Sequence, residues 1–522
     1  MIERAIENWL INTNERDYQT AYCQILIHSG HKILYVSSHR PMEQGKDIIT
    51  IDWNEDYHVY QLKTGNIDLK KWREIVGEVK ELIELPIIHP SVDKSKIPKA
   101  HLVTNGDVTD EVRIQIDQIN EDNIRKKRNY AYLEIVNAKT LLREFINAQG
   151  EFIPQKLEDF DLFLEFFLTK GTDFLDKEKF FNFLNSTIFK DISPPKSRSL
   201  NAISSSVIIV SYLLNPYQIK KNYFALFEAW TCLCGAILRY ANKSGLIRAE
   251  MIDSYNLVFA EIIRNLILLR EEVLGRKDFL EGEWLGDGDL IYRARTTIVL
   301  GVLGALEIHL HESDETYIPS SGISDFIKSN LSLLWFWGES AFPYFFYIIK
   351  ILGFNREIEI ARGLLCDLTL ILIQRNSLMS HACLPNPYFS VNDILQGILK
   401  LTRDEIDFDQ FSGSSYTLRT MILMLVRRGN RKFLEKSWRN ISHIQFKEFQ
   451  PACIEDTFTW RLDIGKNCAE FPKATQSWSD LGKEANDLSC LPEMYKVNKA
   501  LLRFFIITCP HRSNLQIIGL LD

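Results

Sequence analysis

The first part of the chain alternates between two kinds of hydrophobic spacing. Apolar residues that recur every three or four positions predict helices, whereas short runs that alternate residue by residue predict strands. We expect helices over residues 1–12, 15–29, 68–85 and 109–120, strands over 32–37, 101–104 and 131–136, and a last helix that ends at 146. A hairpin is expected over residues 47–63. This order predicts an α/β sandwich, in which helices flank a mixed sheet.

Beyond this region the spacing becomes helical throughout. Gln149, Gly150 and Pro154 interrupt the pattern, and the segments after residue 200 are long, apolar and joined by short connections. Because no fixed repeat period is present, an irregular, mostly α-helical domain is expected rather than a solenoid. The expected segments are 1–148 for the α/β domain, 149–200 for a helical connector, 201–450 for the helical domain and 451–522 for a C-terminal extension packed on it.

Composition and charge limit the class of protein. With 522 residues, 46% of them hydrophobic, the chain can form two or three domains with substantial cores. The net charge of −7 excludes a globally basic surface for nucleic acid, so such a site would be a local patch.

Targeting and redox signals point to a cytoplasmic protein. No run of 18 uninterrupted apolar residues predicts a membrane span, and the amphipathic N-terminus lacks the apolar core of a signal peptide. Nine cysteines are scattered without a framework spacing, which fits reduced thiols in a cytosol.

The hairpin carries a polar pattern that strand pairing does not require. Asp47 opens the apolar run 48–51, a polar turn covers 52–56, and a second alternating run ends in Gln61 and Lys63. Strand side chains alternate, so Gln61 and Lys63 share a face. A turn centred near Glu55 sets Asp47 across from Lys63, whereas a slip of one residue would move it to the other face.

These three side chains suit metal-assisted hydrolysis of a phosphodiester. Asp47 offers a charged oxygen and Gln61 a neutral one, which are ligands for a hard cation such as Mg²⁺. Lys63 would hold a water molecule or stabilise charge on the phosphate.

The pattern Gly45-x-Asp47 followed by Gln61-x-Lys63 resembles the PD-(D/E)xK nuclease superfamily, and most closely its Mrr-like restriction endonuclease branch, in which the second acid is often Gln. Three further stretches resemble that branch's first helix, its third core strand with the following turn, and its last strand with the closing helix. They are Tyr18 to Gly30, His101 to Gly106 and Tyr132 to Leu142. The resemblance covers roughly residues 1–147.

The resemblance implies a metal-dependent DNA endonuclease. Asp47 and Gln61 would bind Mg²⁺ or Mn²⁺, and Lys63 would position the attacking water. The helix of that branch usually carries a metal-proximal Glu where this chain has Gln19, and the acids that could act in its place are Glu7, Glu15 and Glu43. Residues that could contact the DNA backbone are Lys46, Lys70, Lys71, Arg125, Lys126, Lys127 and Arg128, although a charge run is more often a solvated helix end.

Nucleases of this branch with a helical extension are frequently bacterial restriction or anti-phage defence effectors. The resemblance therefore implies DNA as substrate and regulation through the helical domain, by a protein partner or self-association. The alternative is an inactive nuclease fold that binds DNA or acts as a scaffold. Gln19 and the acidic net charge favour that alternative, and the Asp47, Gln61 and Lys63 pattern opposes it. RNA as substrate ranks last, because no strand combines aromatic and basic residues in the RNA-binding pattern.

Overall fold

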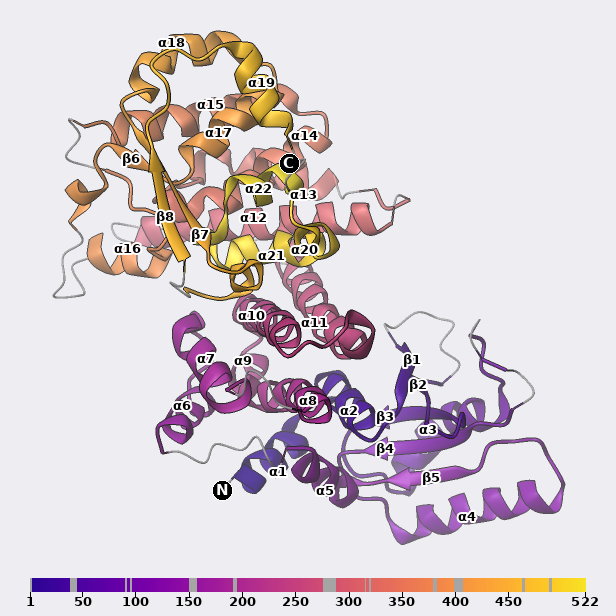
Figure 1. The fold of residues 1–522 in the computed structure, drawn as a ribbon. Helices are drawn as coiled ribbons and strands as arrows, with labels where there is room; N and C mark the ends of the chain where they lie inside the picture. The colour runs from indigo at the N-terminus through magenta and orange to yellow at the C-terminus, as the bar shows by residue number, and fades with distance from the viewer. Residues whose placement is uncertain are drawn as a thin grey trace. The chain divides into compact units, whose positions relative to one another are not determined.

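The computed structural model describes residues 2–37, 45–89, 92–93, 96–149, 157–190, 195–275, 288–314, 316–318, 321–378, 383–398, 407–461, 465–487 and 491–522. They form two compact units, Met1–Glu261 and Ile262–Asp522 (Figure 1).

Unit 1 begins with the expected α/β elements and continues with helices. Its elements are α1 (Ile2–Asn12), α2 (Glu15–His28), β1 (Lys32–Val36), β2 (Ile48–Ile51), β3 (Tyr57–Lys63), α3 (Leu69–Glu84), β4 (Lys99–Thr104), α4 (Asp110–Arg125), β5 (Leu133–Val136), α5 (Ala138–Gln149), α6 (Leu157–Phe167), α7 (Lys177–Phe183), the π-helical turn η1 (Leu184–Ile188), α8 (Lys196–Leu213), α9 (Asn215–Ile219) and α10 (Tyr223–Lys243). The unit boundary falls within α11 (Arg248–Gly275).

The five strands form one mixed sheet in the order β1-β2-β3-β4-β5. The first three strands pair antiparallel, whereas β3, β4 and β5 run parallel. Parallel neighbours need a crossover, and α3 and α4 provide the two crossovers. The sheet flanked by helices, followed by a mostly helical region, confirms the expected fold class.

Side-chain alternation gives the sheet two different faces. On one face, Val59 and Leu102 belong to a buried apolar cluster with Ile75 of α3 and Val112 of α4. On the other face, Tyr60 contacts Tyr22 of α2 edge to face, with ring centroids 5.8 Å apart. β3 therefore lies between α3 on one side and α2 on the other.

The helices that follow residue 149 pack on the α/β elements of unit 1. α8 contacts α1, α2 and α5, and the Ser205 hydroxyl donates to the Ala148 carbonyl at 2.8 Å. The compact unit thus extends past the expected segment limits at 148 and 200, as far as Glu261.

Unit 2 is helical around a small second sheet. Its elements are α12 (Gly288–Ser313), α13 (Ser321–Ser329), α14 (Phe342–Phe354), α15 (Ile358–Arg375), α16 (Val391–Ile398), β6 (Ser414–Ser415), α17 (Leu418–Arg427), α18 (Arg431–Ile441), β7 (Gln445–Pro451), β8 (Gly465–Glu470), α19 (Trp478–Asn486), α20 (Glu493–Val497), α21 (Lys499–Thr508) and α22 (Leu515–Leu521). Short 3₁₀ turns are η2 (Leu331–Leu333), η3 (Glu339–Ala341), η4 (Phe408–Phe411), η5 (Ile454–Phe458) and η6 (Pro510–Arg512). The sheet β6-β7-β8 was not expected from the sequence.

One helix among the described residues, α10, is long and apolar enough to cross a membrane. Its most apolar window is 89% buried inside the protein, which is how the core helix of a folded domain is placed.

Candidate active site

The hairpin forms, but its register differs from the expected one by two residues. Ile48 lies opposite Tyr60, and Ile51 lies opposite Tyr57, so the turn is centred on Asn54 rather than Glu55. Continuing this register sets Asp47 beside Gln61, and the expected position across from Lys63 was wrong. The cause is the turn itself, in which the Asp52 carboxylate accepts from the Asn54 and Asp56 amides, each at 2.9 Å.

Asp47 is fixed to β3 by two hydrogen bonds. Its amide donates to the Tyr60 carbonyl at 2.8 Å, and its Oδ2 accepts from the Leu62 amide at 2.7 Å. The carboxylate therefore stays at the end of β3 whenever the hairpin is paired.

Gln61 and Lys63 share the face of β3 that meets α3, and both contact Glu78. Gln61 Nε2 donates to Glu78 Oε2 at 2.9 Å, and Lys63 Nζ lies 2.8 Å from the same oxygen. Gln61 is 2% exposed, and its Oε1 is a buried acceptor without a hydrogen-bond partner in the part of the chain that is described. A buried acceptor left in this state is costly, so it would gain from a cation or a hydrogen-bond donor.

Glu78 was not identified from the sequence. Asp68 caps the start of α3 by accepting from the Lys71 amide at 2.8 Å, and the buried stripe of the helix includes Val79. Glu78 flanks that stripe and is half exposed, as many solvated glutamates on amphipathic helices are. The one sequence signal for Glu78 was its position next to Val79, which belongs to the buried stripe of α3.

Glu15 approaches the site from the first turn of α2. Its Oε1 lies 4.0 Å from Lys63 Nζ. Burial raises the pKa of Glu15; Lys63 opposes this rise, and the nearby charges of Asp47 and Glu78 add to it. Glu15 and Glu78 thus both lie beside Lys63, and Glu15 is close enough to Asp47 and Glu78 to be influenced by their charges.

Gln19 has a positioning role in this geometry. Its Nε2 donates to the Asp47 carbonyl at 3.4 Å, and its Oε1 accepts from Arg16 at 3.0 Å. Glu15 is therefore the acid of α2 that reaches the site. Glu7 lies exposed on α1, and Glu43 falls outside the described residues.

The segment before Asp47 packs closely against α3. Gly45 has a φ of +71°, and a Cβ there would lie 2.6 Å from the Glu78 carbonyl oxygen. Lys46 is 2% exposed, its Nζ donates to the Glu81 carbonyl at 3.3 Å, and burial lowers its pKa to about 8. The expectation that Lys46 contacts DNA was wrong, because a buried ammonium group cannot reach a phosphate backbone.

The other basic residues lie on the surface, several of them beside carboxylates. Lys71 pairs with Glu74 at 3.4 Å, whereas Lys70 is exposed. Arg125 and Lys126 both pair with Asp122, at 2.5 and 2.9 Å. Lys127 and Arg128 follow, and Arg128 lies over the Tyr130 ring at 5.6 Å. Pairing with acids weakens the positive potential that a phosphate backbone would meet.

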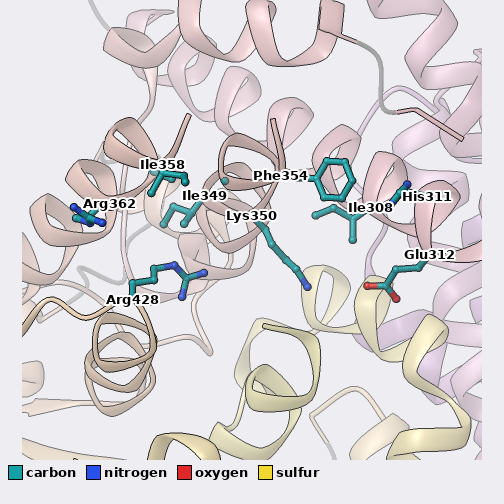
Figure 2. A pocket seen from close by; sticks show the side chains of 11 residues that line it. Ile308, His311, Glu312, Ile349, Lys350, Phe354, Ile358, Arg362 and Arg428 are labelled. Atoms are coloured by element: carbon teal, nitrogen blue, oxygen red, sulfur yellow. The ribbon is translucent and has the colours of Figure 1, made fainter. Parts of the chain in front are cut away.

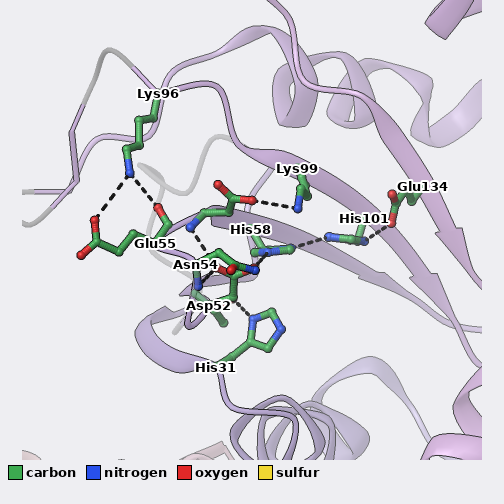
Figure 3. Close-up of polar contacts among 11 residues, drawn as sticks. His31, Asp52, Asn54, Glu55, His58, Lys96, Lys99, His101 and Glu134 are labelled. Carbon is green, nitrogen blue, oxygen red and sulfur yellow. Dashed lines mark hydrogen bonds and ion pairs between the residues drawn. The ribbon is translucent and has the colours of Figure 1, made fainter.

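A second polar cluster, the histidine chain, lies on the opposite face of the sheet (Figure 3). We define it as Asp52, His58, His101 and Glu134. His58 Nε2 lies 3.3 Å from Asp52, His58 Nδ1 lies 3.0 Å from His101 Nε2, and His101 Nδ1 lies 3.3 Å from Glu134. A carboxylate only accepts, so His58 donates from Nε2 to Asp52, and one proton, on His58 Nδ1 or on His101 Nε2, joins the two rings.

His101 Nδ1 faces the Glu134 carboxylate, which is half exposed at the edge of the chain of contacts. Burial, with a further contribution from His58, lowers the pKa of His101 to about 3. His31 contacts the His58 ring, and burial lowers the pKa of His31 to about 4.

Neither cluster is a ready-made metal site. Over the described ranges, no three His, Cys, Asp or Glu side chains are grouped closely enough to hold an ion. The donor set at Asp47, Glu78 and Gln61 nevertheless fits a hard cation, because it offers two carboxylates and the buried, unsatisfied Gln61 Oε1.

Comparison with known proteins gives no relative: no protein-family model, curated protein or solved structure matches the chain.

Proposed function

We propose that unit 1 is a metal-dependent endonuclease that hydrolyses DNA phosphodiester bonds at Asp47, Gln61 and Lys63, with Glu78 as the second carboxylate. The observation that carries this proposal is that Glu15 and Glu78 lie beside Lys63, with Asp47 near Glu15 and the buried Gln61 in contact with Glu78.

The oxygen atoms of the site support a requirement for metal. Asp47, Glu78 and the unsatisfied Gln61 Oε1 offer oxygen ligands to a hard cation, whereas carboxylates without a cation repel a phosphodiester. Asp47, Glu78 and Gln61 would hold Mg²⁺ or Mn²⁺, whose charge polarises the phosphate oxygens when it is bound.

The protein groups then have separate roles. The Leu62 amide orients the Asp47 carboxylate, and Glu78 holds the Lys63 ammonium group at the end of β3. Lys63 would orient a water molecule and stabilise negative charge on the phosphate in the transition state. Glu15, which burial favours in its protonated form, is the candidate to receive or supply a proton.

The test is cleavage of supercoiled plasmid by the full chain with Mg²⁺ or Mn²⁺, with and without candidate partner proteins. Lys63→Ala and Asp47→Ala should each reduce cleavage by at least about a hundredfold. Lys80→Ala is the matched control, because Lys80 is an exposed lysine on the same helix as Glu78 and has no part in the proposed site. Cleavage that persists in Lys63→Ala would refute the proposal.

An inactive fold that binds DNA or acts as a scaffold is the second candidate. The Lys63–Glu78 ion pair favours it, because that pair occupies the amine that catalysis would use. DNA binding without cleavage, under every metal tested, would favour this alternative. In either case we place the protein in the bacterial cytoplasm as a restriction or anti-phage defence effector, controlled by a protein partner or by self-association.

A further inference from the structure

Unit 2 contains a cavity of about 370 Å³ among α12, α14 and α15 (Figure 2). Its apolar wall is formed by Ile308, Ile349, Phe354 and Ile358. Phe354 is 44% exposed, so an aromatic ring lies open to whatever enters the cavity. The volume is that of a site for a small organic molecule.

Three cations line the same cavity: Lys350, Arg362 and Arg428. Figure 2 shows the Lys350 side chain extending between Arg428 and Glu312. Lys350 is half-buried, it donates to the Leu521 carbonyl, and burial lowers its pKa to about 8. An ammonium group removed from water in this way gains from an added anion.

The carboxylates near the cavity are already matched by other cations. Arg503 and Lys499 contact Glu312 at 2.5 and 3.3 Å. Arg427 and Arg428 contact the Asp522 side chain at 3.0 and 2.7 Å. Lys350 therefore adds positive charge in excess of these two acids.

Arg362 supplies an unused donor. Its Nη1 donates to Glu359 at 3.0 Å, but its Nε is buried and has no hydrogen-bond partner among the described residues. A buried donor in this state favours a ligand that brings an acceptor.

We propose that this cavity binds a small organic anion, a carboxylate or phosphate group attached to an apolar or aromatic body. The anion lies at the Lys350 ammonium group, the body rests on Ile308, Ile349 and Phe354, and Arg362 adds positive charge at the edge of the cavity. The site is separate from the nuclease proposal and does not depend on it.

Gly353 offers a way to close the cavity without harming the fold. It lines the cavity within α14, and a Cβ there would meet no atom within 4 Å. Gly353→Leu should therefore fill the space and also favour the helix. Gly363→Leu is the matched control, since Gly363 is exposed on α15, has the same open surroundings and does not line the cavity.

The experiment is calorimetric titration of the full chain with two probes, AMP and octanoate, and with inorganic phosphate and glucose as controls. We expect one probe to bind in the micromolar to low millimolar range. Gly353→Leu should abolish that binding, and Lys350→Met and Arg362→Gln should each weaken it at least tenfold, while Gly363→Leu leaves it unchanged.

The two probes identify the source of the anion, since AMP binding indicates a nucleotide-like ligand and octanoate binding an acyl carboxylate. The proposal is overturned if neither probe binds, if inorganic phosphate binds as tightly as both, or if Gly353→Leu binds like the wild type. Arg362 is half exposed, so Arg362→Gln tests the charge requirement even if Lys350→Met fails to fold.

Discussion

The two faces of β3 carry polar clusters of opposite character. On the α3 face, Glu15 and Glu78 lie beside Lys63, Asp47 is near Glu15, and the Gln61 oxygen has no partner among the residues that the structure describes. On the α2 face, the histidine chain joins two imidazoles to two carboxylates in sequence. The first cluster has an excess of acceptors, whereas the second satisfies most of its own groups.

This difference shows how to separate a binding site from a structural polar core. A cluster whose donors and acceptors match needs nothing from outside and favours one folded state. A cluster of acids with an unsatisfied acceptor gains free energy when a cation arrives. Under the proposed function, the α3 face binds the metal and the α2 face contributes to stability.

The largest expected effect concerns Glu78. Glu78→Gln removes one of the two carboxylates that would hold the metal, so the affinity for Mn²⁺ should fall at least about tenfold. Calorimetric titration with Mn²⁺ measures this directly. Glu74→Gln on the same helix is the control, and equal losses in both variants would remove Glu78 from the site.

Gly45→Ala tests how closely the segment before Asp47 depends on α3. The new Cβ would lie 2.6 Å from the Glu78 carbonyl, and the left-handed φ adds strain, so we expect a loss on the order of 2–3 kcal/mol in the free energy of unfolding. Urea unfolding measures it. Gly30→Ala is the control, with a φ of +89° and open space around it, and it should lose less.

Lys46→Met tests the buried amine. The pKa of Lys46 is lower in the folded chain, about 8, than in the unfolded chain, so between pH 8 and about 10.5 the unfolded state binds more protons. The stability of the wild type should therefore rise with pH in this window through Lys46, by at most about 1.4 kcal/mol per pH unit. Urea unfolding of Lys46→Met should show a smaller rise, and parallel curves would contradict the burial of this amine.

His101→Gln tests how much the histidine chain contributes to stability at acidic pH. Because the folded pKa of His101 is about 3, the imidazole stays neutral in the folded chain while it gains a proton in the unfolded chain below about pH 6.5. Its contribution to stability is therefore present above pH 6.5 and is lost as the pH falls towards 4. Between pH 7 and 4, the free energy of unfolding should depend less steeply on pH in the variant than in the wild type. Plasmid cleavage at pH 8 should change less in His101→Gln than in Glu78→Gln.

The sequence was a good guide to the α/β elements of unit 1. Alternation predicted β2 and β3, and helical spacing predicted α2 and α3. Of these elements, α3 has one regular buried stripe, whereas β3 is buried on both faces. The register was missed by two residues, since it depends on how Asp52 and the left-handed Glu55 (φ 62°) close the turn.

Other features lacked a local signal. β7 (QFKEFQP) and β8 (GKNCAE) contain no β-branched residue, so neither resembles a strand in isolation. Lys46 follows Gly45 in a polar stretch, and its burial depends on α3, which lies more than 20 residues later in the chain. Glu78 could be identified as a site residue only from the structure, in which α3 covers the face of the sheet that carries Gln61 and Lys63.

The hydrogen bond from the Leu62 amide to Asp47 has a consequence for how this domain tolerates mutation. The contact uses the main chain of position 62, so most apolar side chains can replace leucine there without disturbing the carboxylate. Proline is the exception, because it has no amide proton to donate. For this contact, position 62 tolerates a change of apolar side chain, whereas position 47 requires its aspartate.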